Sequence, residues 1–341
     1  MRTRTAAATL LIFVLLTGGS PAPASEPEFW SAGDTTIRGS SAGYLLTTAT
    51  GERLIALPAG VQVEELFALR KSAFVSARGA GPDRGDLYLA LADELGLHLL
   101  GSPDRAAGRS RENAVPMTSA QGELAGVAWL EGPNRQAYGI HFAAWDGVRW
   151  SEPSVVAEAA SGSQLALVGT RLADGSQLLV WSRFDGHDDE IVAARFAGGR
   201  WSAAQLIAED NGVPDITPTV VAVPGGALAS WSRYDGHEYR VVVSRFDGRT
   251  WSTPAWAGPV GATEPVLTRT GTGARGEKQT WLTFANAHPR GWGVLELDPT
   301  GRVLRQGSVA TDLYARPALA ALASGEVRLR WATSQSDLDL K

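Results

Sequence analysis

The sequence predicts an all-β fold made of repeated four-stranded units, and three observations support this prediction. One segment occurs twice in register, at 183–205 and 233–255. The 39 glycines and 18 prolines are typical of an all-β chain with many tight turns. Tryptophans recur every 50 or 51 residues, a period that marks a repeat architecture; one series is Trp150, Trp201 and Trp251, and another is Trp181, Trp231, Trp281 and Trp331.

Each unit divides into four short strand-like runs. The separators in the clearest unit are Pro-Gly-Gly, Asp-Gly-His and Asp-Gly-Arg-Thr, in which Gly supplies positive φ and Asp can hydrogen-bond its own turn. Four antiparallel strands per unit, repeated around an axis, describe a β-propeller blade. The runs of this unit are 216–223, 227–234, 239–246 and 251–258.

Five complete units and two partial ones predict a propeller of six blades. A partial unit at 315–341 supplies two strands, and 43–58 has the strand–turn–strand pattern of the missing pair. Sharing one blade between both ends would close the ring and remove an exposed sheet edge. We therefore expect one propeller over 43–341, with 25–42 as a tail or edge strand. The five complete units lie at about 65–105, 115–158, 165–208, 216–258 and 264–307.

The first 24 residues have the pattern of a secretory signal. Arg2 and Arg4 precede an apolar stretch at 6–16, and Ala22 and Ala24 form an A-x-A site. The apolar stretch is shorter than the roughly 20 residues that span a bilayer, and no later segment is long and apolar enough. We expect cleavage after Ala24 and export to the periplasm or the medium. The chain has no cysteine, so packing rather than disulfides must hold it together.

The charge balance excludes two classes of partner. Without residues 1–24, which hold two arginines and no acidic residue, 29 basic and 36 acidic side chains remain, a net charge of −7. No basic run is present, so nucleic acid and anionic membrane surfaces are not expected partners. We expect a monomer that binds a glycan or an envelope or extracellular protein.

The turn between the third and fourth runs carries a shared motif. It reads SRFDGRTWSTP at 244–254, AAWDGVRWSEP at 143–153 and ARFAGGRWSAA at 194–204. It resembles the Asp-box (BNR) repeat of sialidase-type propellers, although the acid is adjacent to the glycine rather than one residue earlier. Fucose-binding lectin propellers carry a similar D-G-x-x-W pattern. The resemblance implies a structural role, with Asp holding the turn and Trp packing between sheets, for Asp146, Trp150, Trp201, Asp247, Gly248 and Trp251.

A second tryptophan series ends the second run of nearly every unit. A residue that recurs in each unit is expected to have a structural role, so we expect these tryptophans to pack between neighbouring blades. The alternative is that one or two of them stack on a sugar. The series is Trp129, Trp181, Trp231, Trp281 and Trp331.

The second turn is the candidate binding site. It reads WSRFDGH at 181–187 and WSRYDGH at 231–237, at the opposite end of the blade from the Asp-box-like turn. Planar donors and carboxylates beside aromatic rings suit sugar hydroxyls or a carboxylate. The alternative is an Arg–Asp bridge that shapes the turn, with an exposed His. The candidate ligand-binding residues are Arg183, Asp185, His187, Arg233, Asp235 and His237.

These patterns favour an exported, non-catalytic propeller that binds a glycan or a protein partner. Arg183 and Arg233 obey the repeat, which argues against catalysis. A sialidase-like glycoside hydrolase is the alternative, and its resemblance implies an arginine cluster with a tyrosine nucleophile. A scaffold subunit of a cell-envelope complex is a further alternative. We expect no cofactor and no metal motif, although an oxygen-rich loop suits bound Ca²⁺; its acids are Asp185, Asp188, Asp189 and Glu190.

Overall fold

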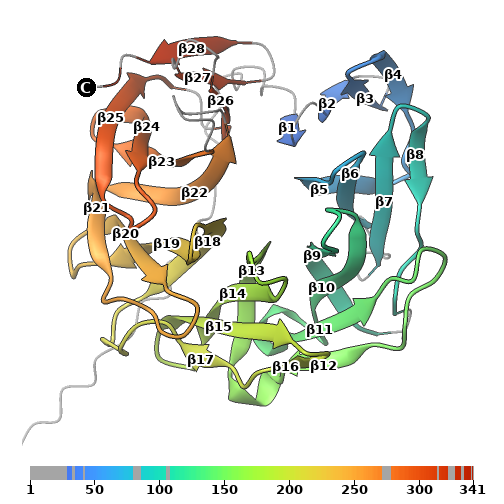
Figure 1. Cartoon of the computed structure of the whole chain (residues 1–341), viewed down its shortest axis with the longest axis horizontal. Coiled ribbons are helices and arrows are strands. Elements are labelled where there is room, and N and C mark those ends of the chain that lie inside the picture. Colours follow the sequence, from blue (N-terminus) through green and yellow to red (C-terminus); the bar gives the residue numbers. More distant parts are fainter. Residues whose placement is uncertain are drawn as a thin grey trace, which may run out of the picture.

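The chain forms a ring of seven antiparallel β-sheets (Figure 1). A computed structural model describes residues 29–32, 35–40, 43–79, 86–104, 108–270, 278–312, 315–321, 327–331, 334–338 and 340. The predicted β-propeller is confirmed, but the predicted number of six blades is wrong. The predicted signal at 1–24 lies outside the described residues. No helix among the described residues is long and apolar enough to cross a membrane.

Blades 2 to 6 are the five units predicted from the repeat; each has the four expected strands, and the sheet of blade 4 includes a fifth. Blade 2 has β5 (Val61–Ala68), β6 (Ala73–Gly79), β7 (Leu87–Asp93) and β8 (Gly96–Leu99). Blade 3 has β9 (Ser110–Thr118), β10 (Leu124–Gly132), β11 (Gly139–Ala144) and β12 (Ser154–Ala157). Blade 4 has β13 (Ser163–Arg171), β14 (Gln177–Phe184), β15 (Asp189–Ala197) and β16 (Arg200–Trp201), and β17 (Gln205–Leu206) also pairs with β15.

The remaining elements complete these blades. Blade 5 has β18 (Asp215–Val223), β19 (Gly226–Tyr234), β20 (Tyr239–Phe246) and β21 (Ala255–Val260). Blade 6 has β22 (Ala262–Thr270), β23 (Gln279–Ala287), β24 (Arg290–Leu297) and β25 (Val303–Ala310). Two 3-10 helices, η2 (Arg135–Ala137) and η3 (Ala159–Ser161), lie in loops of blade 3 and between blades 3 and 4.

The two ends of the chain build separate blades, which corrects the predicted shared blade. Residues 43–58 do form a strand pair, but two earlier strands pair with it, so blade 1 is complete without the C-terminal segment. The third strand of blade 7 comes from the C-terminal segment itself and not from the N-terminal segment. Blade 1 has β1 (Phe29–Ala32), β2 (Thr35–Ser40), β3 (Gly43–Thr48) and β4 (Gly51–Ile55), and blade 7 has β26 (Ala318–Ala321), β27 (Val327–Arg330) and β28 (Gln335–Leu338).

The hydrophobic core lies between consecutive blades rather than at the centre of the ring. Separate buried clusters join each blade to the next from blade 1 to blade 7. The repeated tryptophans lie in them: Trp129, Trp181 and Trp231 are fully buried against the preceding blade. Trp281 is also fully buried, and Trp331 is 4% exposed. Because these indole rings are buried, none of the five tryptophans offers a face on which a ligand could stack.

The Asp-box-like turns are held by local hydrogen bonds. Oδ1 of Asp247 accepts from the backbone N–H of Arg249 and Thr250 at 2.8 Å each, and these bonds hold the pKa of Asp247 below its usual value. Gly248 has φ +97°, a conformation that favours glycine. Trp251 packs on Phe246 with ring centroids 5.1 Å apart, as Trp201 does on Phe196. Turn chemistry and ring packing thus account for the motif.

A β-bulge recurs in the innermost strand of the blades. In blades 3 to 5, two residues of the first strand lie opposite one tryptophan of the second strand. The first of the two has a left-handed backbone, which side chains other than glycine rarely adopt. The bulge bends the inner strand where it lines the centre of the ring. The left-handed residues are Asn113, Ala166, Thr217 and, in blade 6, Glu264, with φ from +50° to +55°.

Replacing Ala166 with glycine is expected to raise the free energy of unfolding by about 0.5–1 kcal/mol. A left-handed conformation costs an alanine about 1–2 kcal/mol, of which the extra freedom of glycine in the unfolded chain offsets a part. Guanidinium unfolding of the Ala166→Gly variant measures the change, and Ala166→Val is the control that should destabilise the protein. A loss of stability in Ala166→Gly would contradict the left-handed bulge.

Candidate functional site

The two D-G-H turns lie at the ends of blades 4 and 5, between the second and third strands, and are called the D-G-H end below. In both turns the aspartate caps its own backbone. Oδ1 of Asp185 accepts from the N–H of His187 at 2.9 Å, and Oδ1 of Asp235 accepts from the N–H of His237 at 2.9 Å. The backbone hydrogen bonds lower the pKa of both carboxyls, so they are ionised and already occupied. The rings of His187 and His237 are exposed.

Arg233 is held by a buried carboxylate. Its Nε and Nη2 donate to Oδ1 and Oδ2 of Asp215 at 2.8 and 2.5 Å, a bidentate pair across β18 and β19. Asp215 is fully buried. Burial raises its pKa, and the hydrogen bonds from Arg233 oppose that effect. The guanidinium therefore has a structural partner inside the blade, and that partner is Asp215 rather than the aspartate of its own turn.

Arg183 is not equivalent to Arg233, although the sequence repeats it. The residue opposite Arg183 is Gln164, where blade 5 has Asp215. The Gln164 Oε1 accepts from Nε1 of Trp181 at 2.5 Å and gives Arg183 no carboxylate. Nε of Arg183 is buried and has no hydrogen-bond partner. Of the two predicted arginines, Arg183 is thus the one without a carboxylate partner from the preceding strand.

Aromatic rings surround the turns. Phe184 is 41% exposed and lies opposite Asp189 in the ladder of β14 and β15. Tyr234 and Tyr239 flank the second turn with ring centroids 5.4 Å apart, and both are half-buried. Burial raises the pKa of Tyr239, and the nearby Asp189 raises it further. The D-G-H end therefore combines rings with charged and polar side chains.

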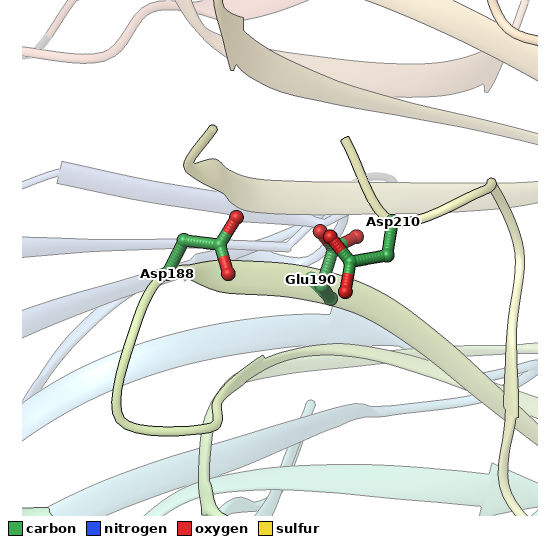
Figure 2. A group of neighbouring side chains, drawn as sticks. All are labelled: Asp188, Glu190 and Asp210. Carbon is green, nitrogen blue, oxygen red and sulfur yellow. The ribbon is translucent and has the colours of Figure 1, made fainter. Parts of the chain in front are cut away.

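An acidic cluster lies at this end of blade 4 (Figure 2). Asp188 and Glu190 come from the second turn and β15, and Asp210 comes from the segment between β17 and β18. One carboxylate oxygen of each lies within 4.8 Å of the others. Asp188 is 7% exposed and Glu190 is 1% exposed.

The sequence singled out two of these three acids. Asp185 and Asp189, which it grouped with them, have other roles: Asp185 caps its turn, and Asp189 accepts from Oγ of Ser182 at 3.1 Å. Asp210 was missed. The signal for it is topological, because the fourth strand of an antiparallel blade ends beside the turn between the second and third strands.

Burial within the cluster raises the pKa of two of its carboxyl groups. Burial, followed by the charges of Asp215, Asp188 and Asp210, raises the pKa of Glu190 to about 8. The backbone N–H of Asn211 opposes this rise only weakly. Burial and the neighbouring acids also raise the pKa of Asp188. Strong shifts of this kind are concentrated at functional sites, because burial and like charges are costly elsewhere.

Two cavities lie outside this region. A central cavity of about 950 Å³ is lined by first strands, including Glu64, Glu65, Arg269 and Arg316. Glu64 is already bound to Arg78, with Nε of the arginine 3.1 Å from its carboxylate. A second cavity of about 500 Å³ lies along β7, lined by Tyr88, Leu99 and neighbouring residues. Neither contains the predicted residues.

The ring of antiparallel sheets, most of them four-stranded, defines the chain as a β-propeller protein. No family model matches it, and no curated protein matches it. The resemblance of the third turn to sialidase repeats is therefore supported for the propeller fold alone.

Solved structures share the fold at low sequence identity. A protein of unknown function from Dyadobacter fermentans is 12% identical with a TM-score of 0.54, covering 80% of this chain and 94% of that one. A lectin from Aleuria aurantia, in complex with α-methyl-L-fucoside, is 11% identical with a TM-score of 0.51, covering 86% and 96%. A prolyl endopeptidase is 13% identical with a TM-score of 0.53, covering 89% of this chain and 44% of that one. Lectin and peptidase alike show the fold, not the activity.

Proposed function

We propose that this chain is an exported, non-catalytic carbohydrate-binding propeller whose ligand contacts the D-G-H end of blades 4 and 5. The signal-like pattern of residues 1–24 supports export. The observation that carries the binding proposal is the grouping of exposed and half-exposed rings with polar groups that have no structural partner.

The side chains of this end suit a sugar. The rings of Phe184 and Tyr239 offer apolar faces on which the C–H face of a pyranose can pack. The exposed imidazoles of His187 and His237 offer donors for hydroxyl groups. The strands of blades 4 and 5 hold these side chains in place, so little conformational entropy is lost when a ligand binds.

The same geometry supports a binding role over catalysis. Asp185 and Asp235 are engaged by their own turns, and Arg233 is engaged by Asp215. Arg233 is therefore not available to form, together with Arg183, the arginine cluster that a sialidase-like site requires. The lectin of Aleuria aurantia, which shares the propeller fold, has been solved in complex with α-methyl-L-fucoside.

A glycan-array screen with the mature protein tests this proposal. The wild type is expected to bind a defined set of glycans, and the Phe184→Ala/Tyr239→Ala double variant is expected to lose binding at least about tenfold, because two stacking faces contribute more than 1.4 kcal/mol. Trp145→Ala is the matched control, a half-exposed ring at the opposite end of blade 3. Circular dichroism checks that each variant is folded. A wild type that binds no glycan, or a double variant that binds like the control, would overturn the proposal.

A further inference from the structure

The acidic cluster contains carboxylate oxygens that are buried and unsatisfied. Oε1 and Oε2 of Glu190 and Oδ2 of Asp188 are shielded from solvent and have no hydrogen-bond partner of normal geometry. The backbone N–H of Asn211 interacts with Glu190 only weakly. A buried carboxylate without a partner is costly, and proteins normally satisfy such groups by hydrogen bonds, ion pairs or bound cations. One oxygen of Glu190 lies within 4.8 Å of one oxygen of each of the other two acids, so the three carboxylates share one small volume.

The three acids have no basic partner in the part of the chain that the structure describes. Among the residues that the structure describes, no arginine, lysine or histidine forms an ion pair with any of the three acids. Arg233 is the closest candidate by charge, but Asp215 holds it. Arg183 lies opposite Glu190 in the ladder of β14 and β15 without forming a pair.

The cluster also departs from the repeat. Fifty residues further on, blade 5 has Glu238 in place of Asp188 and Arg240 in place of Glu190. There the guanidinium of Arg240 lies over the ring of Trp256, 4.6 Å from its centroid. A feature that the blade architecture does not need in blade 5 serves something other than the architecture in blade 4.

We propose that Asp188, Glu190 and Asp210 bind one calcium ion, which ties the second turn of blade 4 to the segment that leads into blade 5. An all-oxygen set suits a hard cation, whereas Zn²⁺ prefers nitrogen and sulfur ligands. Calcium–oxygen bonds of about 2.3–2.6 Å place two ligands of one ion up to about 5 Å apart, which matches the cluster. Asp210 is exposed, so the ion can enter from solvent and complete its shell with water.

Calcium binding is tested with the metal alone, on folded protein treated with chelator. Isothermal titration is expected to show one calcium per chain. At calcium concentrations about 100-fold above Kd, the melting temperature should rise by about 4 °C, since the ion binds only the folded state. Magnesium at the same ionic strength is expected to stabilise less, because its smaller octahedral shell fits a flexible carboxylate set poorly.

Three variants locate the site. Asp210→Asn is expected to weaken calcium binding at least about tenfold, the loss of one charged ligand. Glu209→Gln, which removes the same charge from the neighbouring exposed residue, should leave the affinity within about twofold because it gives the ion no ligand. Glu190→Gln should abolish the calcium-induced rise while leaving the calcium-free protein at least as stable as the wild type, because burial and the neighbouring acids already disfavour a negative charge at this position.

Two results would overturn the proposal: a folded wild type that binds no calcium, or equal weakening by Glu209→Gln and Asp210→Asn, which would indicate general charge screening. No glycan takes part in these measurements. Calcium binding and carbohydrate binding can therefore fail independently.

Discussion

Replacing Glu131 with alanine is expected to lower the free energy of unfolding by about 3–5 kcal/mol, the cost of removing one partner of a buried ion pair. Glu131 is 1% exposed, and its Oε2 accepts from Nε of Arg111 at 3.0 Å and from Nε1 of Trp129 at 2.8 Å. Nε of Arg109 lies 2.6 Å from the other carboxylate oxygen. The alanine variant would leave the Arg111 guanidinium, itself 1% exposed, without its closest carboxylate. Guanidinium unfolding measures the loss.

Two controls separate charge from packing. Glu131→Gln keeps an acceptor for Trp129 but loses the charge. Its free energy of unfolding should therefore lie between that of the wild type and that of the alanine variant. Glu123→Ala changes an exposed glutamate before β10 and should alter stability by less than about 0.5 kcal/mol. A loss below about 1 kcal/mol for Glu131→Ala would contradict the buried network.

Replacing Trp181 with alanine is expected to cost about 3–5 kcal/mol, the range for deleting a buried large aromatic side chain. Trp181 is fully buried in the cluster that joins blades 3 and 4. Its removal opens a cavity between two sheets and leaves Oε1 of Gln164 without its donor. Chemical unfolding monitored by far-UV circular dichroism should show the lower midpoint.

The matched control is the tryptophan of β21. Trp256 is 47% exposed, and its main contact is the cation–π interaction with Arg240. Trp256→Ala should therefore cost no more than about 1 kcal/mol. Equal destabilisation by the two changes would mean that the tryptophans at the ends of the second strands do not carry the packing between blades.

Turn chemistry in the sequence predicted most of the fold. The D-G turns and the regular tryptophans located most of the strands of blades 3 to 6, because each turn residue acts through local backbone geometry. The count of blades failed at both ends, where β1, β2 and β28 are short and pair only through tertiary context. Gln335–Leu338, for example, is too polar and too brief to be predicted as a strand.

The candidate site could be predicted only in part, because its asymmetry is not local. The sequence showed two equal W-S-R-[FY]-D-G-H turns, but the partner of each arginine comes from the preceding strand. Asp215 engages Arg233, whereas Gln164 leaves Arg183 free. Asp210 likewise joins Asp188 and Glu190 only once the fourth strand has returned to the same end. Pairing across strands decided both features.

The separate blades at the two ends of the chain also bear on how such a ring changes over evolution. Within the described residues no strand is exchanged between blades 1 and 7, and the buried clusters link only sequential neighbours. Stability then accumulates junction by junction, as in a linear array of repeats. Duplication or loss of one unit of about 50 residues would add or remove a single junction without rethreading any other sheet. A substitution in blade 4 would change the packing against blades 3 and 5 and have little effect on the other blades.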